Sequence, residues 1–219
     1  MRQDFVSRAE EIARYFAFLG AIDSGDHRVV ATSDGNPAYN HLDLTELTKT
    51  LKANSFLLLY NLVESTVKNA IEAIFDDLHA NSIVFDTCRK ELRKIMLHKL
   101  KQRNIDKLLP LITNLANDIA RVTFSKNELF SGNVDARLIR KTALEYGFSE
   151  PRKRSGNLRT VKDNRNDLSH GNKTFGEVGR EYDFKRLDSI RTEVTEYLEE
   201  LIVNIEQYIK AQGYLTPSP

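Results

Sequence analysis

The most strongly apolar part of the sequence is FLLLYNLV, which spans residues 56–63 and has one clearly polar position, Asn61. It lies in the middle of a longer pattern, in which apolar residues recur at helical spacing from Leu44 to Leu78. Asp43 is placed to be an N-cap, and Glu46 completes a capping box three residues later. The pattern predicts one long helix over 43–78, whose apolar middle is contacted on several faces.

The rest of the chain repeats the helical period and almost lacks the alternation that marks strands. Ten glycines and five prolines fall in clusters between the apolar patterns. We therefore expect further helices at residues 4–19, 84–103, 106–124, 133–147 and 183 to about 211. Another is expected from 157 to 166 or a little beyond, halted at Gly171. Asn133 is expected to cap the helix that ends at Gly147, a glycine suited to a left-handed stop.

These elements predict an all-α fold, with one domain over residues 1–219 built around two long antiparallel helices, 43–78 and 183–211. Residues 20–42 are polar and are expected to form a loop insertion, in which Val29 and Val30 could form a short strand or hairpin arm. Residues 213–219 are expected to form a flexible tail.

Composition narrows the classes of function. The formal net charge is +1, so binding of nucleic acid would depend on local patches rather than on an overall field. Cys88 is the only cysteine, which excludes an intrachain disulfide and fits a reducing compartment, and we expect its thiol to be inert. No signal peptide or membrane-spanning run is visible, so we expect a soluble, cytoplasmic protein without a membrane partner.

The segment most informative about function is RNDLSHGN, residues 165–172. Arg165 and His170 lie five positions apart, which in a regular helix turns the two side chains about 140° away from each other. Two arrangements could still bring them together. Gly171 could let the chain leave the helix and re-aim His170, or both side chains could converge with their copies from a second subunit.

These residue types suit phosphoryl transfer from RNA. Histidine titrates near neutrality, so His170 could take a proton from a ribose 2′-hydroxyl or return one to the leaving 5′-oxygen. The forked guanidinium of Arg165 could hold two oxygens of a pentacoordinate phosphate. Asn166 could orient the imidazole or hydrogen-bond a phosphate oxygen. The scheme requires no metal and no cofactor.

The segment resembles the Arg-x4-His signature of the HEPN superfamily (higher eukaryotes and prokaryotes nucleotide-binding), including the polar residue after the arginine. Residues 57–65 (LLLYNLVES) resemble the first core helix of that superfamily. Three further segments are similar to a bacterial stand-alone branch, the MAE-type HEPN-like nucleases: 131–137 (SGNVDAR), 145–148 (EYGF) and 175–180 (FGEVGR).

The resemblance implies a HEPN-like helical bundle that forms a homodimer, with two Arg-x4-His motifs facing one cleft. It also implies a metal-independent endoribonuclease that leaves 2′,3′-cyclic phosphate ends, often in toxin–antitoxin or anti-phage systems, with an antitoxin or defence-system protein as a further partner. By residue, Arg165 matches the motif arginine, Asn166 the polar position and His170 the catalytic histidine. Glu64 matches an acidic position only loosely and is expected to be a buried hydrogen-bonding residue.

Basic residues precede the motif and suit a strip that follows an RNA backbone: Arg152, Lys153, Arg154, Arg159 and Lys162. The alternative is an ordinary solvated loop and helix face. The second basic stretch, 89–103, is more typical of a solvated helix face. Asp76, Asp77 and His79 lie close together in the sequence, but without further visible ligands they do not predict a metal site.

Two other functions compete with the ribonuclease. The chain could be a non-catalytic HEPN-like module that binds RNA or a nucleotide or serves as an assembly partner, or it could be a plain helical scaffold. The intact set of Arg165, Asn166 and His170 favours the enzyme, because a pure binding module has no need for the histidine.

Overall fold

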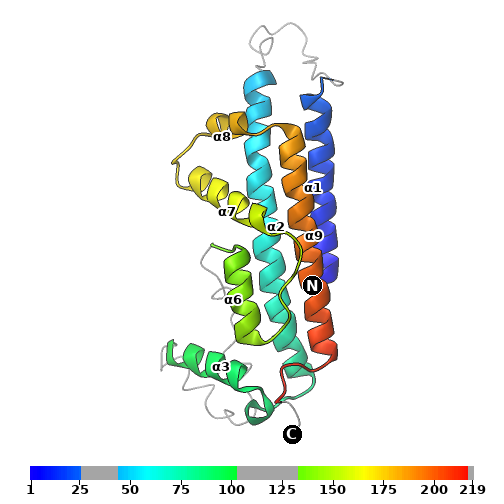
Figure 1. The fold of residues 1–219 in the computed structure, drawn as a ribbon, viewed down its shortest axis with the longest axis vertical. Coiled ribbons are helices and arrows are strands. Elements are labelled where there is room, and N and C mark those ends of the chain that lie inside the picture. The colour runs from blue at the N-terminus through cyan, green and yellow to red at the C-terminus, as the bar shows by residue number, and fades with distance from the viewer. Residues whose placement is uncertain (26–43, 103–132, 217–219) are drawn as a thin grey trace, which may run out of the picture. The chain divides into compact units, whose positions relative to one another are not determined.

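A computed structural model describes residues 1–25, 44–102 and 133–216 of the chain. These residues form α-helices and a 3-10 helix, with no strand among them, and the predicted all-α class is confirmed (Figure 1). The helices are α1 (Arg2–Asp23), α2 (Leu44–Ala80), α3 (Lys90–Gln102), α6 (Ala136–Tyr146), α7 (Gly156–Ser169), α8 (Phe175–Glu181) and α9 (Phe184–Lys210).

The chain divides into two compact units. The site unit contains Gln3–Val63 and Arg154–Glu196, and the second unit contains Met1–Arg2, Glu64–Lys153 and Tyr197–Pro219. Helices α2 and α9 each contribute residues to both units. The single domain over residues 1–219 stays a prediction.

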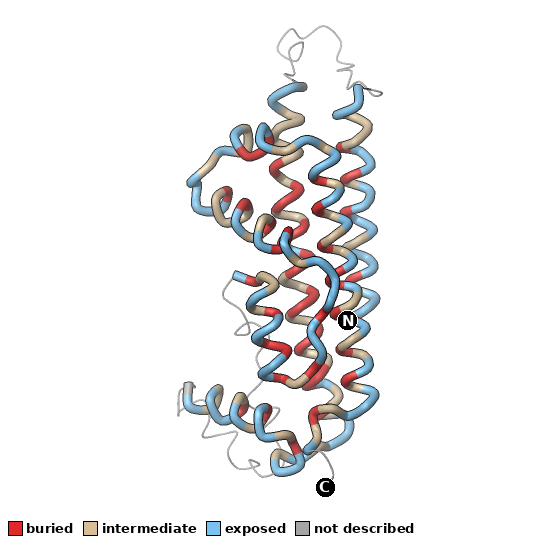
Figure 2. The backbone as a smooth tube through the Cα atoms, in the orientation of Figure 1, coloured by how far each residue is buried: buried red, intermediate tan, exposed pale blue. Residues whose placement is uncertain are grey.

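In the site unit, α1 is amphipathic and buries one stripe of its surface, while its other faces are exposed (Figure 2). The buried residues follow helical spacing: Phe5, Ile12, Phe16 and Leu19. The ring of Phe16 packs against that of Phe184 in α9, with centroids 6.5 Å apart. At the end of α1, Asp23 forms an ion pair with Lys52 of α2 at 2.6 Å. Helix α1 therefore contacts both α2 and α9 within the site unit.

The direction of the long helices differs from the prediction. Within the site unit α2 and α9 run in the same direction, and α1 runs antiparallel to both (Figure 1). Near the start of α2, the backbone of Lys49 lies against Gly179, shortly before α9 begins. Two consecutive helices pack antiparallel when a short loop joins them. Here α3, α6, α7 and α8 intervene and bring the chain back beside the start of α2.

Two helix starts also differ from the prediction. The helix expected from Val84 begins at Lys90, because Cys88 is extended and pairs as an isolated bridge with Leu215. Burial raises the pKa of the Cys88 thiol, which agrees with an inert role. The N-cap of α6 is Asp135 rather than Asn133, since its carboxylate accepts from the amide of Leu138 at 3.0 Å.

Other boundaries match the sequence pattern. Gly147 ends α6 in the left-handed conformation, with φ of 88°. The long helix predicted from Asp43 begins at Leu44 and the last one at Phe184. Asp43 itself, the expected helix 106–124 and the pair Val29–Val30 lie outside the described residues. No helix in the described ranges combines the length and apolarity needed to cross a membrane.

The sequence pattern missed α8. Its start is fixed by a capping box in which Thr174 accepts from the amide of Glu177, and the carboxylate of Glu177 accepts from the amide of Thr174. The signal was present as Thr-x-x-Glu, but the helix is only seven residues long and has little apolar periodicity.

Candidate active site

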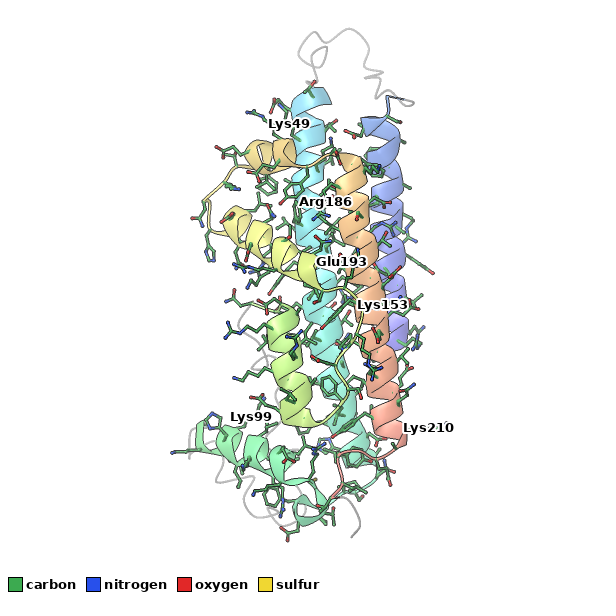
Figure 3. The ribbon with its side chains drawn as sticks, in the orientation of Figure 1. Lys49, Lys99, Lys153, Arg186, Glu193 and Lys210 are labelled. Carbon is green, nitrogen blue, oxygen red and sulfur yellow. The ribbon has the colours of Figure 1, made fainter. Side chains whose placement is uncertain are left out.

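Helix α7 carries the motif, and its first turn is held by α9. Ser155 provides no side-chain cap; the carboxylate of Glu193 accepts instead from the amide and the side-chain nitrogen of Asn157, both at 2.8 Å. Arg186 donates to the side-chain oxygen of Asn157, also at 2.8 Å. Figure 3 labels Arg186 and Glu193 on α9. A carboxylate at a helix N-terminus is favoured by the exposed amides and the helix dipole.

The middle of α7 is held by a buried amide. The side-chain nitrogen of Asn164 donates to the hydroxyl of Tyr182 at 2.9 Å and to the carbonyl of Thr160 at 2.9 Å. The ring of Tyr182 in turn packs edge to face with that of Phe56 in α2, with centroids 4.8 Å apart. A buried amide with both hydrogens satisfied orients the helix more strictly than apolar packing alone.

Arg165 follows Asn164 and lies on an aromatic ring. Its guanidinium carbon is 4.2 Å from the ring centroid of Tyr60, a fully buried residue of α2. One terminal nitrogen donates to the side-chain oxygen of Asn166 at 2.9 Å. Asn166 therefore contacts the arginine, whereas the sequence suggested that it orients the imidazole or binds phosphate.

His170 caps the C-terminal end of α7 and its side chain is exposed. Its backbone is still helical, with φ of −94° and ψ of −1°, and its amide donates to the carbonyl of Asn166 at 2.9 Å. Gly171 then takes the left-handed conformation with φ of 70°, and the amide of Asn172 donates to the carbonyl of Asp167 at 2.9 Å. The amide of Gly171 donates to the carbonyl of Leu168 at 3.3 Å. Together with the bond from Asn172 to Asp167, it forms a Schellman turn, which ends the helix directly after the histidine.

This backbone geometry bears on the first of the two arrangements that the sequence left open. Gly171 turns the chain after His170 and does not re-aim it. Since the backbone of His170 remains helical, Arg165 and His170 project about 140° apart, as in a regular helix. A regular helical spacing of five residues does not by itself bring the two side chains of one chain to the same face.

A comparison with known protein families covers nearly the whole chain. A family model described as HEPN_MAE_28990-like HEPN matches residues 1–214. The chain belongs to this HEPN family. It matches no curated protein and no solved structure. Membership makes the chain a module of the nucleotide-binding or nuclease type.

The basic residues of the HEPN chain do not all lie in one unit. Arg154, Arg159 and Lys162 belong to the site unit, while Arg152 and Lys153 belong to the second. Arg154 and Arg159 are exposed, and Arg159 forms an ion pair with Asp163 at 3.3 Å. Lys162 is mostly buried, with its side chain 19% exposed.

The basic loop before α7 is fixed through its backbone. The amides of Arg152 and Lys153 donate to one carboxylate oxygen of Glu200 in α9, at 3.0 and 2.9 Å, and both side chains are exposed. Both side chains therefore lie at the surface of the second unit.

Glu64 and Asp77 have structural partners in the second unit. Glu64 is half-buried and forms an ion pair with Lys68 at 2.7 Å, one turn along α2. Asp77 accepts from the hydroxyl of Tyr214 at 2.7 Å. These contacts explain both acidic residues as parts of the helical packing.

Proposed function

We propose that this HEPN protein is a metal-independent endoribonuclease whose active site combines Arg165, Asn166 and His170 from two copies of the chain. The observation that carries the proposal is the Schellman turn. It leaves an exposed imidazole at the end of a helix that also presents an arginine held on Tyr60. A scaffold protein has no need for this combination.

The chemistry is transesterification followed by release. One imidazole takes the proton of the ribose 2′-hydroxyl, whose oxygen attacks the adjacent phosphorus. The bond from phosphorus to the 5′-oxygen breaks, and a second, protonated imidazole supplies the proton to that oxygen. Arg165 stabilises the negative charge on the phosphoryl oxygens. The products are a 2′,3′-cyclic phosphate and a 5′-hydroxyl end.

Two features of one chain support a second copy in the active site. In-line displacement benefits from a base and an acid on opposite sides of the phosphorus, and each motif offers a single imidazole. Arg165 and His170 also diverge along α7. A two-fold axis would place His170 of one protomer near Arg165 of its partner, and such isologous pairing is the commonest form of association.

The proposed RNA contacts are Arg154, Arg159 and Lys162 in the site unit and, separately, Arg152 and Lys153 in the second unit. Four of these side chains are exposed, and that of Lys162 is 19% exposed. Their role is to neutralise phosphates, so affinity should fall as salt concentration rises. They carry no sequence information, since phosphate contacts position the RNA without reading its bases.

Cleavage is expected to persist in EDTA and to require the 2′-hydroxyl. A short fluorescent RNA should be cut at the same rate with or without the chelator, and mass spectrometry should find a cyclic phosphate end. The same oligonucleotide with 2′-deoxyribose at the cleaved position should remain intact, because it lacks the attacking oxygen.

Loss of cleavage in EDTA that Mg²⁺ restores would assign the chemistry to carboxylates and a metal. Binding without cleavage would support the non-catalytic HEPN module instead.

Mixed dimers are expected to show that two histidines act together. Wild-type and His170→Ala chains are co-expressed with different tags, and dimers are reassorted at equal proportions. If each dimer needs both imidazoles, activity falls to about a quarter of the wild-type value, because only that share of dimers has two wild-type copies. A fall to one half would mean that each subunit acts alone, and a fully active monomer in light scattering would rule out the composite site.

The proposed biological role is that of a toxin or an anti-phage effector restrained by a partner protein. Induced expression of the wild-type chain should slow the growth of a bacterial host, and expression of His170→Ala at the same level should not. Equal growth of the two strains would contradict a toxic ribonuclease.

A further inference from the structure

We propose that Tyr60 is a positioning residue that fixes the plane of the Arg165 guanidinium. This inference rests on the proposed function, because it assigns a purpose to the arginine of that site. The ring of Tyr60 is fully buried in the site unit, and its face lies 4.2 Å from the guanidinium carbon.

The contacts with Tyr60 and Asn166 restrict the orientation of the guanidinium. The ring of Tyr60 supports its flat face, and the side-chain oxygen of Asn166 accepts from one terminal nitrogen at 2.9 Å. A planar group held at one face and at one edge can no longer rotate freely about the end of its side chain. The rotamer entropy of a free arginine side chain corresponds to about 2 kcal/mol. If the guanidinium is already oriented, less of this entropy is lost when phosphate binds.

The support under the arginine is itself held in place. Tyr60 follows Phe56 by four residues, so the two rings lie one turn apart on the same side of α2. Phe56 meets the ring of Tyr182, whose hydroxyl accepts from Asn164. Two aromatic residues of one helix therefore hold two adjacent residues of α7, directly through Tyr60 and indirectly through Phe56.

The arrangement predicts a distinct effect on catalysis. An arginine that stabilises charge in the transition state contributes most when it needs no rearrangement during the reaction. Without the ring, the guanidinium can turn away while its charge remains near the site. We therefore expect loss of the ring to reduce kcat more strongly than the affinity for RNA.

The test compares Tyr60→Phe, which keeps the ring, with Tyr60→Leu, which removes it. We expect Tyr60→Phe to cleave within about threefold of wild type and Tyr60→Leu to lower kcat by about ten- to a hundredfold, the range typical of a misplaced catalytic group. Phe75→Leu is the matched control, since Phe75 is a buried aromatic residue of the same helix that contacts Tyr146 in the second unit. If Tyr60→Leu cleaves as well as Phe75→Leu, the inference is wrong.

Two further measurements separate positioning from loss of structure and from failure of the proposed function. In an Arg165→Ala background, Tyr60→Leu should cause no further loss of the residual kcat. A loss by the same factor in both backgrounds would mean a purely structural role. The NMR signals of the Arg165 side chain should show the upfield shift of a stacked group in wild type and Tyr60→Phe, and lose it in Tyr60→Leu. If the shift is present but wild type does not cleave RNA, the ribonuclease proposal fails while the positioning remains. An unchanged shift in Tyr60→Leu overturns the inference.

Discussion

Replacing His170 with alanine is expected to reduce RNA cleavage to background without unfolding the protein. General acid–base catalysis contributes about 10²- to 10⁴-fold, and in a composite site the substitution removes both the base and the acid. The side chain is exposed and the backbone at this position is helical, so alanine fits the same conformation. Stability should change by no more than about 0.5 kcal/mol.

Arg165→Ala should lower cleavage by about 10²- to 10³-fold, as for the loss of one preorganised group that stabilises a transition-state charge. Cleavage rates are measured on the same labelled RNA, and folding is checked by circular dichroism and thermal unfolding. His98→Ala and Arg14→Ala are the matched controls, because both residues are exposed and lie on other helices, α3 and α1. If either His170→Ala or Arg165→Ala cleaves at the wild-type rate, the assignment of the active site is wrong.

Gly179→Ala is expected to cause the largest loss of stability among the substitutions considered for the site unit. Gly179 is buried in α8, and a Cβ atom there would lie 1.9 Å from the carbonyl oxygen of Lys49 and 2.5 Å from its carbonyl carbon. Both clashing atoms belong to the backbone of α2, so no side-chain rotation relieves them. Helix α8 would have to move away from α2, and the turn that joins it to α7 would move with it.

Overpacking of this kind destabilises a protein by about 1–3 kcal/mol, and a backbone clash belongs at the upper end. For a chain of this length the midpoint of thermal unfolding should fall by about 4–10 °C, which differential scanning calorimetry measures directly. Gly176→Ala is the matched control in the same helix. Its Cβ would meet nothing closer than the side-chain oxygen of Glu46 at 3.5 Å, so the variant should be as stable as wild type or slightly more. A midpoint for Gly179→Ala equal to that of Gly176→Ala would contradict the close contact.

The sequence determined the elements wherever a single helix has its own start and stop signals. The apolar spacing from Leu44 to Leu78 predicted α2 almost to its ends, and Gly147 and Gly171 ended their helices as expected. These features depend on residues within one or two helical turns, so the local sequence is enough to predict them. The same locality explains two errors. The extended conformation of Cys88 depends on pairing with Leu215, and Asp135, rather than Asn133, is the residue whose carboxylate reaches a free helix amide.

The candidate residues were also visible in the sequence, since Arg165, Asn166 and His170 are encoded within six positions. Their relative geometry could not be predicted from the sequence. The helical backbone of His170 follows from where the Schellman turn begins, and the sequence allowed either of two placements. Two contacts of α7 join residues that lie far apart along the chain. Arg165 packs on Tyr60, which precedes it by 105 positions, and Glu193 caps the first turn of the helix.

What the sequence alone determined is therefore the all-α class, most helix boundaries and the motif. Only the tertiary structure decided three features of the site unit: α2 and α9 run in the same direction there, α8 packs backbone to backbone on α2, and an arginine lies on a buried tyrosine. The physical reason is the range of the interactions. Helix formation and capping are set by contacts a few residues apart, whereas packing direction and the orientation of the arginine depend on surfaces that meet only after the chain has folded.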